Sequence, residues 1–183
     1  MRKLIILFVI LAVCIMPASS KGMKKASPEE KRARINEMAD ATIQELTADS
    51  PGATELFGKA YGYAVFDNLK LSLMISGGGG QGVAVNKSSG ARTYMKMGTV
   101  GLNIGLGGQK YQLVFLFQDS KRFNDFVEHG WQADAQANAV AGTAGASAGT
   151  TFKNGMAVYQ ITEAGLMLQA DIAGTKYWKS KLN

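Results

Sequence analysis

Residues 101–117, GLNIGLGGQKYQLVFLF, decide the fold. In the first part of this stretch, Leu102, Ile104 and Leu106 alternate with glycine and asparagine, and a period of two is typical of a β-strand. The second part, residues 111–117, is an apolar run that fits a fully buried strand. A strand face without side chains costs conformational entropy, so we expect something to lie very close to its backbone. Another sheet layer or a tightly closed barrel is the first candidate, and a lipid chain is the second.

The strand pattern extends along the chain in both directions from this stretch. Similar patterns predict strands at 61–66, 69–75, 81–85, 93–97, 156–162, 166–172 and 175–178. Asp67-Asn68 is expected to end the first of them, and residues 86–90 to form a hairpin loop. Alanines alternate with polar residues over 133–141 and predict one more strand, before a small-residue loop at 142–155. The predicted fold class is α+β, a strongly curved antiparallel sheet, sandwich- or barrel-like, with helices on its outside.

A helical segment is predicted before the strands. Ser27 is a suitable N-cap, Pro28 fits the first helical position, and Glu30 completes a capping box. Apolar residues then recur at three- and four-residue spacing over 35–46, which gives the helix one apolar stripe. Residues 49–51 (Asp-Ser-Pro) should end this helix and begin a short second one.

The first helix carries its basic residues mainly at its front: Lys21, Lys24, Lys25, Lys31, Arg32 and Arg34. We expect an ordinary surface helix that packs on the body through its apolar stripe; a helix that touches a membrane is the alternative. A third helix is predicted after Asp119-Ser120, with Phe123, Phe126 and Val127 facing inward and Gly130 at its end.

The N-terminus has the layout of a secretory signal. A basic start at residues 1–3 precedes an apolar run over 4–16, which is shorter than the roughly 20 residues that span a bilayer. Small residues then favour cleavage before Lys21. The alternative is a lipoprotein signal in which Cys14 becomes lipidated. We therefore expect an exported protein, periplasmic or membrane-associated, with a signal peptide at 1–20, a helical segment at 21–55 and a glycine-rich β domain at 56–183.

The composition narrows the classes of function. The chain has 183 residues, a formal net charge of +6, 22 glycines and a single cysteine. Glycines without a triplet period exclude collagen, and a lone cysteine excludes a disulfide framework within the chain. Cleavage before Lys21 would also remove Cys14, which would exclude a cysteine nucleophile and a cysteine-based metal site.

The search for catalytic motifs finds little. Residues 77–82 (GGGGQG) match a dinucleotide-binding pattern, but a strand follows instead of the helix that this motif requires. The only histidine, His129, lies in the last turn of a predicted helix, where a structural role is expected. Acidic residues are scattered, mostly at turns and caps. We expect no enzyme, no cofactor, no metal site and no binding of nucleic acid.

Basic residues gather near the turns of the β domain, and the C-terminal segment 177–181 (YWKSK) combines interfacial aromatics with flexible cations. This combination suits a lipid headgroup layer, although solvated loops that improve solubility are an equally good explanation. The candidate lipid-binding residues are Lys59, Lys70, Lys87, Arg92, Lys110, Lys176, Trp178, Lys179 and Lys181.

Several segments together resemble the SYLF domain, a lipid-binding module associated with actin regulators. The resemblance runs from about Leu56 to the C-terminus and rests on residues 59–66, 77–85, 101–105, 111–117, 123–126, 139–145, 164–166 and 170–174. It implies a non-catalytic domain that binds anionic phospholipid through a basic surface and an adjoining N-terminal helix. The loop after Val85 is shorter than in many members, and an export signal separates the chain from actin.

The sequence thus predicts non-enzymatic binding of anionic phospholipid or a membrane surface in the cell envelope. The alternative is a structural or interaction module of the envelope that binds protein or glycan. Cations gathered beside Trp178 and an apolar rim would favour lipid, whereas evenly dispersed cations would favour the alternative. A hydrolase with a site invisible in the sequence is a third, minor possibility.

Overall fold

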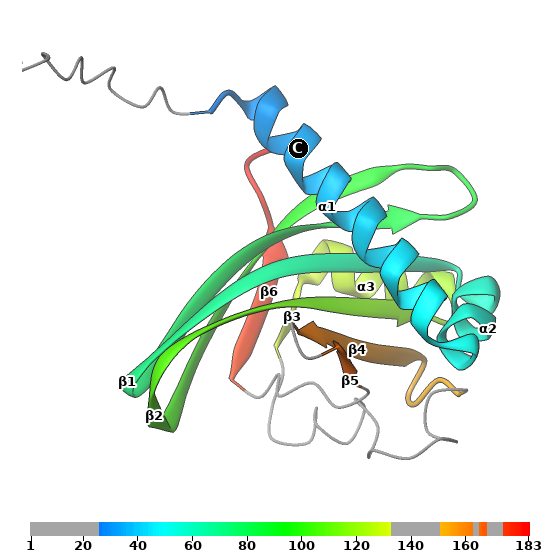
Figure 1. Cartoon of the computed structure of the whole chain (residues 1–183). Coiled ribbons are helices and arrows are strands. Elements are labelled where there is room, and N and C mark those ends of the chain that lie inside the picture. The colour runs from blue at the N-terminus through cyan, green and yellow to red at the C-terminus, as the bar shows by residue number, and fades with distance from the viewer. Residues whose placement is uncertain (1–25, 133–150, 163–164, 168–173) are drawn as a thin grey trace, which may run out of the picture.

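The computed structural model describes residues 26–132, 151–162, 165–167 and 174–183; the expected leader and the alanine-rich strand at 133–141 lie outside these ranges. Figure 1 shows the arrangement of the elements. In chain order they are α1 (Pro28–Asp49), α2 (Pro51–Lys59), β1 (Gly62–Asn86), β2 (Arg92–Phe117), α3 (Ser120–His129), β3 (Trp131–Gln132), β4 (Met156–Thr162), β5 (Gly165–Met167) and β6 (Thr175–Lys179).

The helix ends are where local sequence signals place them. The Ser27 hydroxyl accepts a hydrogen bond from the Glu30 backbone N–H at 3.1 Å, and the Glu30 carboxylate accepts one from the Ser27 N–H at 2.8 Å, which completes the predicted capping box. The Ser50 side chain caps α2 and the Asp119 side chain caps α3. Gly130 ends α3 with a φ of 72°, in the region that glycine adopts without strain.

The structure has two long strands, β1 and β2, where the sequence predicted several shorter ones. β1 and β2 form one long antiparallel hairpin, and the predicted loop at its end is confirmed. The prediction that Asp67-Asn68 ends a strand is wrong. Asn68 is buried opposite Tyr111 in the register, and its side-chain amide donates a hydrogen bond to the Tyr111 hydroxyl. The strand therefore continues through this pair, and the side-chain N–H of Asn68 has its hydrogen-bond partner inside the sheet.

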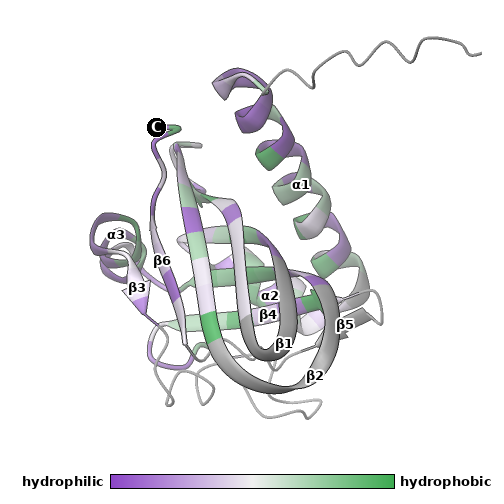
Figure 2. Cartoon of the chain, turned by 90° about the vertical axis from the view of Figure 1, so that its left-hand side faces the viewer, coloured by the Kyte–Doolittle hydropathy of each residue, from purple (hydrophilic) through white to green (hydrophobic). Residues whose placement is uncertain are grey.

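The strands form a six-stranded sheet in the order β3-β6-β2-β4-β5, with β1 paired to β2. β1 and β2 bend together into a deep curve, with α1 and α3 on opposite sides of it (Figure 2). On the inner side of the curve, a Cβ atom at Gly82 would lie 2.1 Å from the Val65 carbonyl oxygen, and one at Gly80 equally close to that of Asp67. Glycine at these positions lets the two halves of β1 touch.

Each face of the curved sheet has its own apolar cluster. The inner face packs against α3, with Phe66, Phe115 and Tyr177 in one aromatic group. The outer face packs against α1 and α2 through residues such as Val83 and Leu116. The predicted α+β class with a strongly curved antiparallel sheet is confirmed.

The remaining strand predictions have different outcomes. The strands at 156–162 and 175–178 are confirmed by β4 and β6. Of the predicted strand at 166–172, only the part up to Met167 lies in the described residues, as part of β5. The short strand β3 was not predicted.

Candidate binding surface

None of the helices in the described part of the chain covers one end of the outer sheet face. Its outward residues come from three neighbouring strands, and the register places them in rows: Gln81 beside Lys96 beside Trp178, then Gly79 beside Gly98 beside Lys176, then Gly77 beside Val100. We call these eight residues the β1–β2–β6 surface. Because side chains alternate along a strand, all of them point away from the inner core.

Trp178 and Val100 are the large hydrophobic residues exposed within the described part of the chain, at 40% and 72%. Both belong to the β1–β2–β6 surface. A Cβ atom at Gly98 would lie 3.2 Å from Cη2 of Trp178, so the indole ring extends over the bare backbone of this glycine. The glycines thus leave the surface flat and its two apolar side chains prominent.

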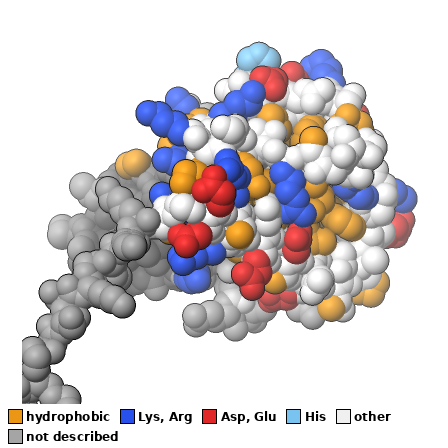
Figure 3. Space-filling view, turned by 90° about the horizontal axis from the view of Figure 1, so that it is seen from above, with side chains coloured by type: hydrophobic (Ala, Val, Ile, Leu, Met, Phe, Trp, Pro, Cys, Tyr) orange, Lys and Arg blue, Asp and Glu red, His pale blue; other side chains and the backbone are white. Residues whose placement is uncertain are grey.

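The charge on this surface is entirely positive. Lys96 lies directly opposite Trp178 across the β2–β6 pair, and Lys176 lies opposite Gly98. Both lysines are exposed, and no ion pair holds either of them within the described residues. The face seen in Figure 3, over α1, instead mixes basic with acidic side chains.

The predicted residues Lys176 and Trp178 therefore come together, while Lys96 and Val100 were missed. Lys96 lies within a predicted strand, whereas the predicted site was built from cations near turns. Because side chains alternate along a strand, the sequence could have placed Lys96 on the outer face. Its position beside Trp178, however, depends on the pairing of β2 with β6, which lie about 80 residues apart in the chain.

Two further predicted cations are held by acids. Lys59 forms an ion pair with Glu55 one turn earlier in α2, at 2.5 Å, and the hydrogen bond and charge of this lysine lower the pKa of Glu55. Lys179 reaches from β6 to Glu128 of α3, at 2.7 Å, and lowers the pKa of that carboxyl in the same way. These four groups are solvent-exposed, so each pair adds little to stability.

Lys87 and Arg92 tie the hairpin to the helices. The Lys87 ammonium donates hydrogen bonds to the carbonyls of Phe57 and Gly58 at the end of α2 and lies 4.5 Å from the centroid of the Phe57 ring. Burial lowers the pKa of Lys87. Arg92 donates hydrogen bonds to Asp40 at 2.9 Å and to Asn36 at 3.0 Å, both on α1. These contacts give both residues a structural role.

Three predicted site residues remain. Two of them do not belong to the β1–β2–β6 surface, and the side chain of the third is not described. Lys110 and Lys181 are exposed elsewhere, on β2 and in the C-terminal segment. The side chain of Lys70 is not among those the structure describes. Among the predicted cations whose side chains the structure describes, Lys176 alone thus lies on the β1–β2–β6 surface.

The N-terminal helix packs on the sheet as expected. Ile35, Ala39 and Leu46 of its apolar stripe are buried against the outer face. Arg32 also donates a hydrogen bond to the Leu182 carbonyl at 2.8 Å, which joins α1 to the C-terminal segment. The stripe is therefore occupied by the protein itself.

The described ranges contain neither a membrane-spanning helix nor a cluster of metal-binding side chains. There, no helix is both long and apolar enough to cross a membrane. Nor do three or more potential metal-binding side chains come together anywhere in that part of the chain. His129 lies in the last turn of α3, where the sequence places it.

Comparison with known proteins finds a similar protein but no matching family. No protein-family model matches the chain. Over 153 residues, or 84% of its length, the chain is 50% identical to Beta cell expansion factor A from Aeromonas veronii. The matched region is 59% of that protein, so the chain spans less than two thirds of its relative. The name of the relative refers to beta cell expansion and to no biochemical activity.

Proposed function

We propose that this chain is a non-enzymatic, SYLF-type protein that binds anionic phospholipid, or an anionic membrane surface, through its β1–β2–β6 surface. One observation carries the proposal: two unpaired lysines, Lys96 and Lys176, flank the exposed Trp178 and Val100 on a flat, glycine-rich sheet face. An indole ring beside flexible cations suits the headgroup layer of a bilayer.

The attraction would be electrostatic and reversible. A lysine near an anionic membrane contributes about 1 kcal/mol, and salt screens this contribution over about 10 Å at 0.1 M. The flat glycine backbone lets both ammonium groups approach one plane of headgroups together. Trp178 would then add an apolar contact at the depth of the headgroups.

The expected secretory leader would bring the protein to the cell envelope, where such a membrane surface is available. The alternative within the same proposal is a lipoprotein, anchored in the membrane by a lipid on Cys14. Either route makes reversible binding useful, because the protein would already be confined near a membrane.

The alternative is an envelope module that binds protein or glycan. Lys110 and Lys181 favour it, since both are exposed and neither belongs to the paired rows of residues around Trp178. An exposed indole can also serve as an anchor in a protein interface.

Sedimentation with liposomes separates the two functions. We expect binding to vesicles containing phosphatidylglycerol, little binding to phosphatidylcholine alone, and weakening by salt. The double variant Lys96→Gln/Lys176→Gln should bind about thirtyfold more weakly, from about 1 kcal/mol for each lysine. The matched control Lys110→Gln/Lys181→Gln removes the same charge elsewhere and should retain most of the binding.

Two results would contradict the proposal. Equal binding to neutral and anionic vesicles, independent of salt, would eliminate the electrostatic mechanism. An equal loss in both double variants would show that net charge acts without the β1–β2–β6 surface. Circular dichroism of each variant confirms that the fold is retained.

A further inference from the structure

A second candidate site lies on the other side of the sheet. A half-open cavity of about 120 Å³ is formed between α3, β3 and the start of β4. Six side chains define it: Arg122, Asp125, Phe126, His129, Trp131 and Met156. Since α3 packs against the inner face, this cavity is separate from the β1–β2–β6 surface on the outer face.

The wall of the cavity toward the core is apolar. Phe126 and Met156 are buried, and Trp131 is half-buried beside them. The Trp131 ring packs against Phe126 at 6.4 Å and Tyr177 at 5.8 Å between centroids, which holds the indole in place. A ligand here would meet a preformed aromatic wall.

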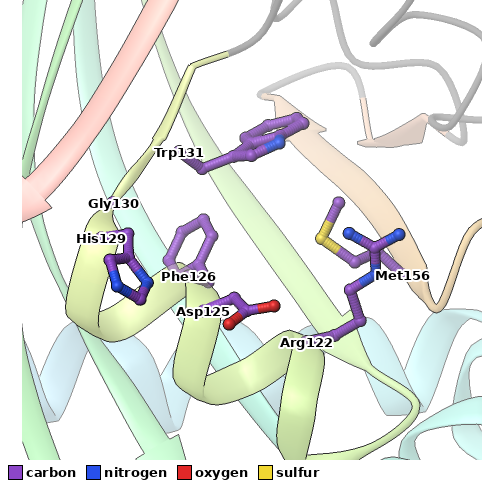
Figure 4. A pocket seen from close by; sticks show the side chains of 7 residues that line it. All are labelled: Arg122, Asp125, Phe126, His129, Gly130, Trp131 and Met156. Carbon is purple, nitrogen blue, oxygen red and sulfur yellow. The ribbon is translucent and has the colours of Figure 1, made fainter.

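Arg122 supplies a positive group at one end of the cavity. Its stem rests on Gly155: with a φ of 77°, this glycine sits so close that an added Cβ would be 2.8 Å from Cγ of Arg122. Arg122 and Met156 both line the cavity, and Figure 4 shows the guanidinium extending toward Met156. No ion pair or side-chain hydrogen bond engages this guanidinium within the described residues.

The acid in the cavity already has a partner. Asp125 forms an ion pair with Lys121 at 3.2 Å, one turn earlier in α3. Its negative charge is thereby offset, whereas the charge of Arg122 is not. The cavity therefore favours an anionic ligand over a cationic one.

We propose that this cavity binds a small carboxylic acid with a short apolar body. Its carboxylate would accept paired hydrogen bonds from Arg122, because the planar guanidinium matches carboxylate geometry. The apolar body would lie against Trp131 and Met156. The cavity, at about 120 Å³, is somewhat smaller than an engineered cavity of about 150 Å³ that holds benzene, which limits the enclosed part of the ligand to a few carbon atoms or one small ring.

Tryptophan fluorescence gives a direct test. The chain has two tryptophans, so Trp178→Phe leaves Trp131 as the single reporter. Titration with butanoate and benzoate should change its emission in a saturable way, at millimolar concentrations. The neutral amides butanamide and benzamide have nearly the same shapes and should bind about tenfold more weakly or worse, because they lack the charge. No lipid is present, so the result does not depend on the proposed membrane binding.

Variants then assign the carboxylate contact. In the Trp178→Phe background, Arg122→Gln should weaken binding at least about tenfold, and Arg122→Lys should weaken it less, because the charge remains without the fork. Lys110→Gln, a matched loss of charge far from the cavity, should leave binding unchanged. Near-UV circular dichroism confirms the fold of each variant.

Several outcomes would overturn the assignment. Amides that bind as well as the acids would show that charge is not recognised, and equal competition by chloride or phosphate would indicate a general anion effect. If tetramethylammonium binds and this binding is lost in Asp125→Asn, the cavity binds cations and not anions. Absence of any saturable change with either acid up to about 50 mM would show that the cavity does not take this ligand class, given the affinities that ligands of this size reach.

Discussion

The two ends of the outer sheet face differ sharply, although the same two strands build both. At the end covered by α1, the outward residues are large and apolar, as in Val83, Val85 and Tyr94. At the uncovered end, the same strands present Gly79 and Lys96, beside Trp178 of β6. The change occurs within a few residues of β1 and β2.

This difference indicates that the uncovered end is not built to pack against another helix. A helix buries an apolar stripe and needs apolar residues beneath it, as α1 finds at Val83 and Val85. Glycines and unpaired lysines offer almost nothing of that kind. They instead provide a flat, positive area, which matches a flat, negative partner.

The largest difference in stability is expected between alanine variants of two glycines on opposite faces of β1. Gly82→Ala would place a methyl group 2.1 Å from the Val65 carbonyl, so the two halves of β1 must separate; we expect a loss of at least about 4 kcal/mol in unfolding free energy. Gly79→Ala meets only an ordinary contact of 3.6 Å and should change stability by less than about 0.5 kcal/mol. Urea unfolding followed by circular dichroism measures both.

Equal effects of the two alanines would show that the inner contact at Gly82 does not hold the curve. A protein that no longer folds with Gly82→Ala, while Gly79→Ala folds normally, agrees with the expectation. The pair thus separates the glycines that shape the sheet from those that leave its surface flat.

The sequence predicted best what is decided locally. The helix starts predicted at Ser27, within residues 49–51 and after Asp119-Ser120 depend on capping contacts three residues away, and all three are confirmed. Strand continuity through Asn68 was missed, because its partner Tyr111 lies 43 residues later. A polar pair in isolation favours a turn, and only the pairing across the sheet gives the side-chain N–H of Asn68 its acceptor on Tyr111.

The candidate surface shows the same contrast between features set by sequence neighbours and features set by distant residues. Lys176 and Trp178 are neighbours in sequence and were predicted together, whereas Lys96 joins them only through sheet pairing. Lys87 and Arg92 were predicted to bind lipid, but each is held by a partner, 30 and 52 residues away respectively. Cation counts along a sequence therefore cannot distinguish a free charge from one that holds the fold together.

The next effect compares apolar residues at the two ends of the outer face. Leu46 of α1 is fully buried at the covered end, and Leu46→Ala should cost about 3 kcal/mol of unfolding free energy. Val100, 72% exposed at the uncovered end, should tolerate Val100→Ala within about 0.5 kcal/mol. Thermal and urea unfolding give both values. A large loss for Val100→Ala would mean that this end is covered in solution, for instance by a second copy of the chain.

The smallest effect concerns the charges that join α1 to the hairpin. Arg92 and Asp40 are partly exposed, at 29% and 51% of their side chains, so solvent screens their attraction. A double-mutant cycle with Asp40→Asn and Arg92→Gln should give a coupling of about 0.5 kcal/mol, falling further in 0.5 M salt. A coupling above about 2 kcal/mol would show that this pair, and not burial of Leu46, holds α1 on the sheet. The expected small value instead implies that α1 stays at the covered end because the apolar face is there, and that the absence of such a face is what leaves Lys96 and Trp178 open.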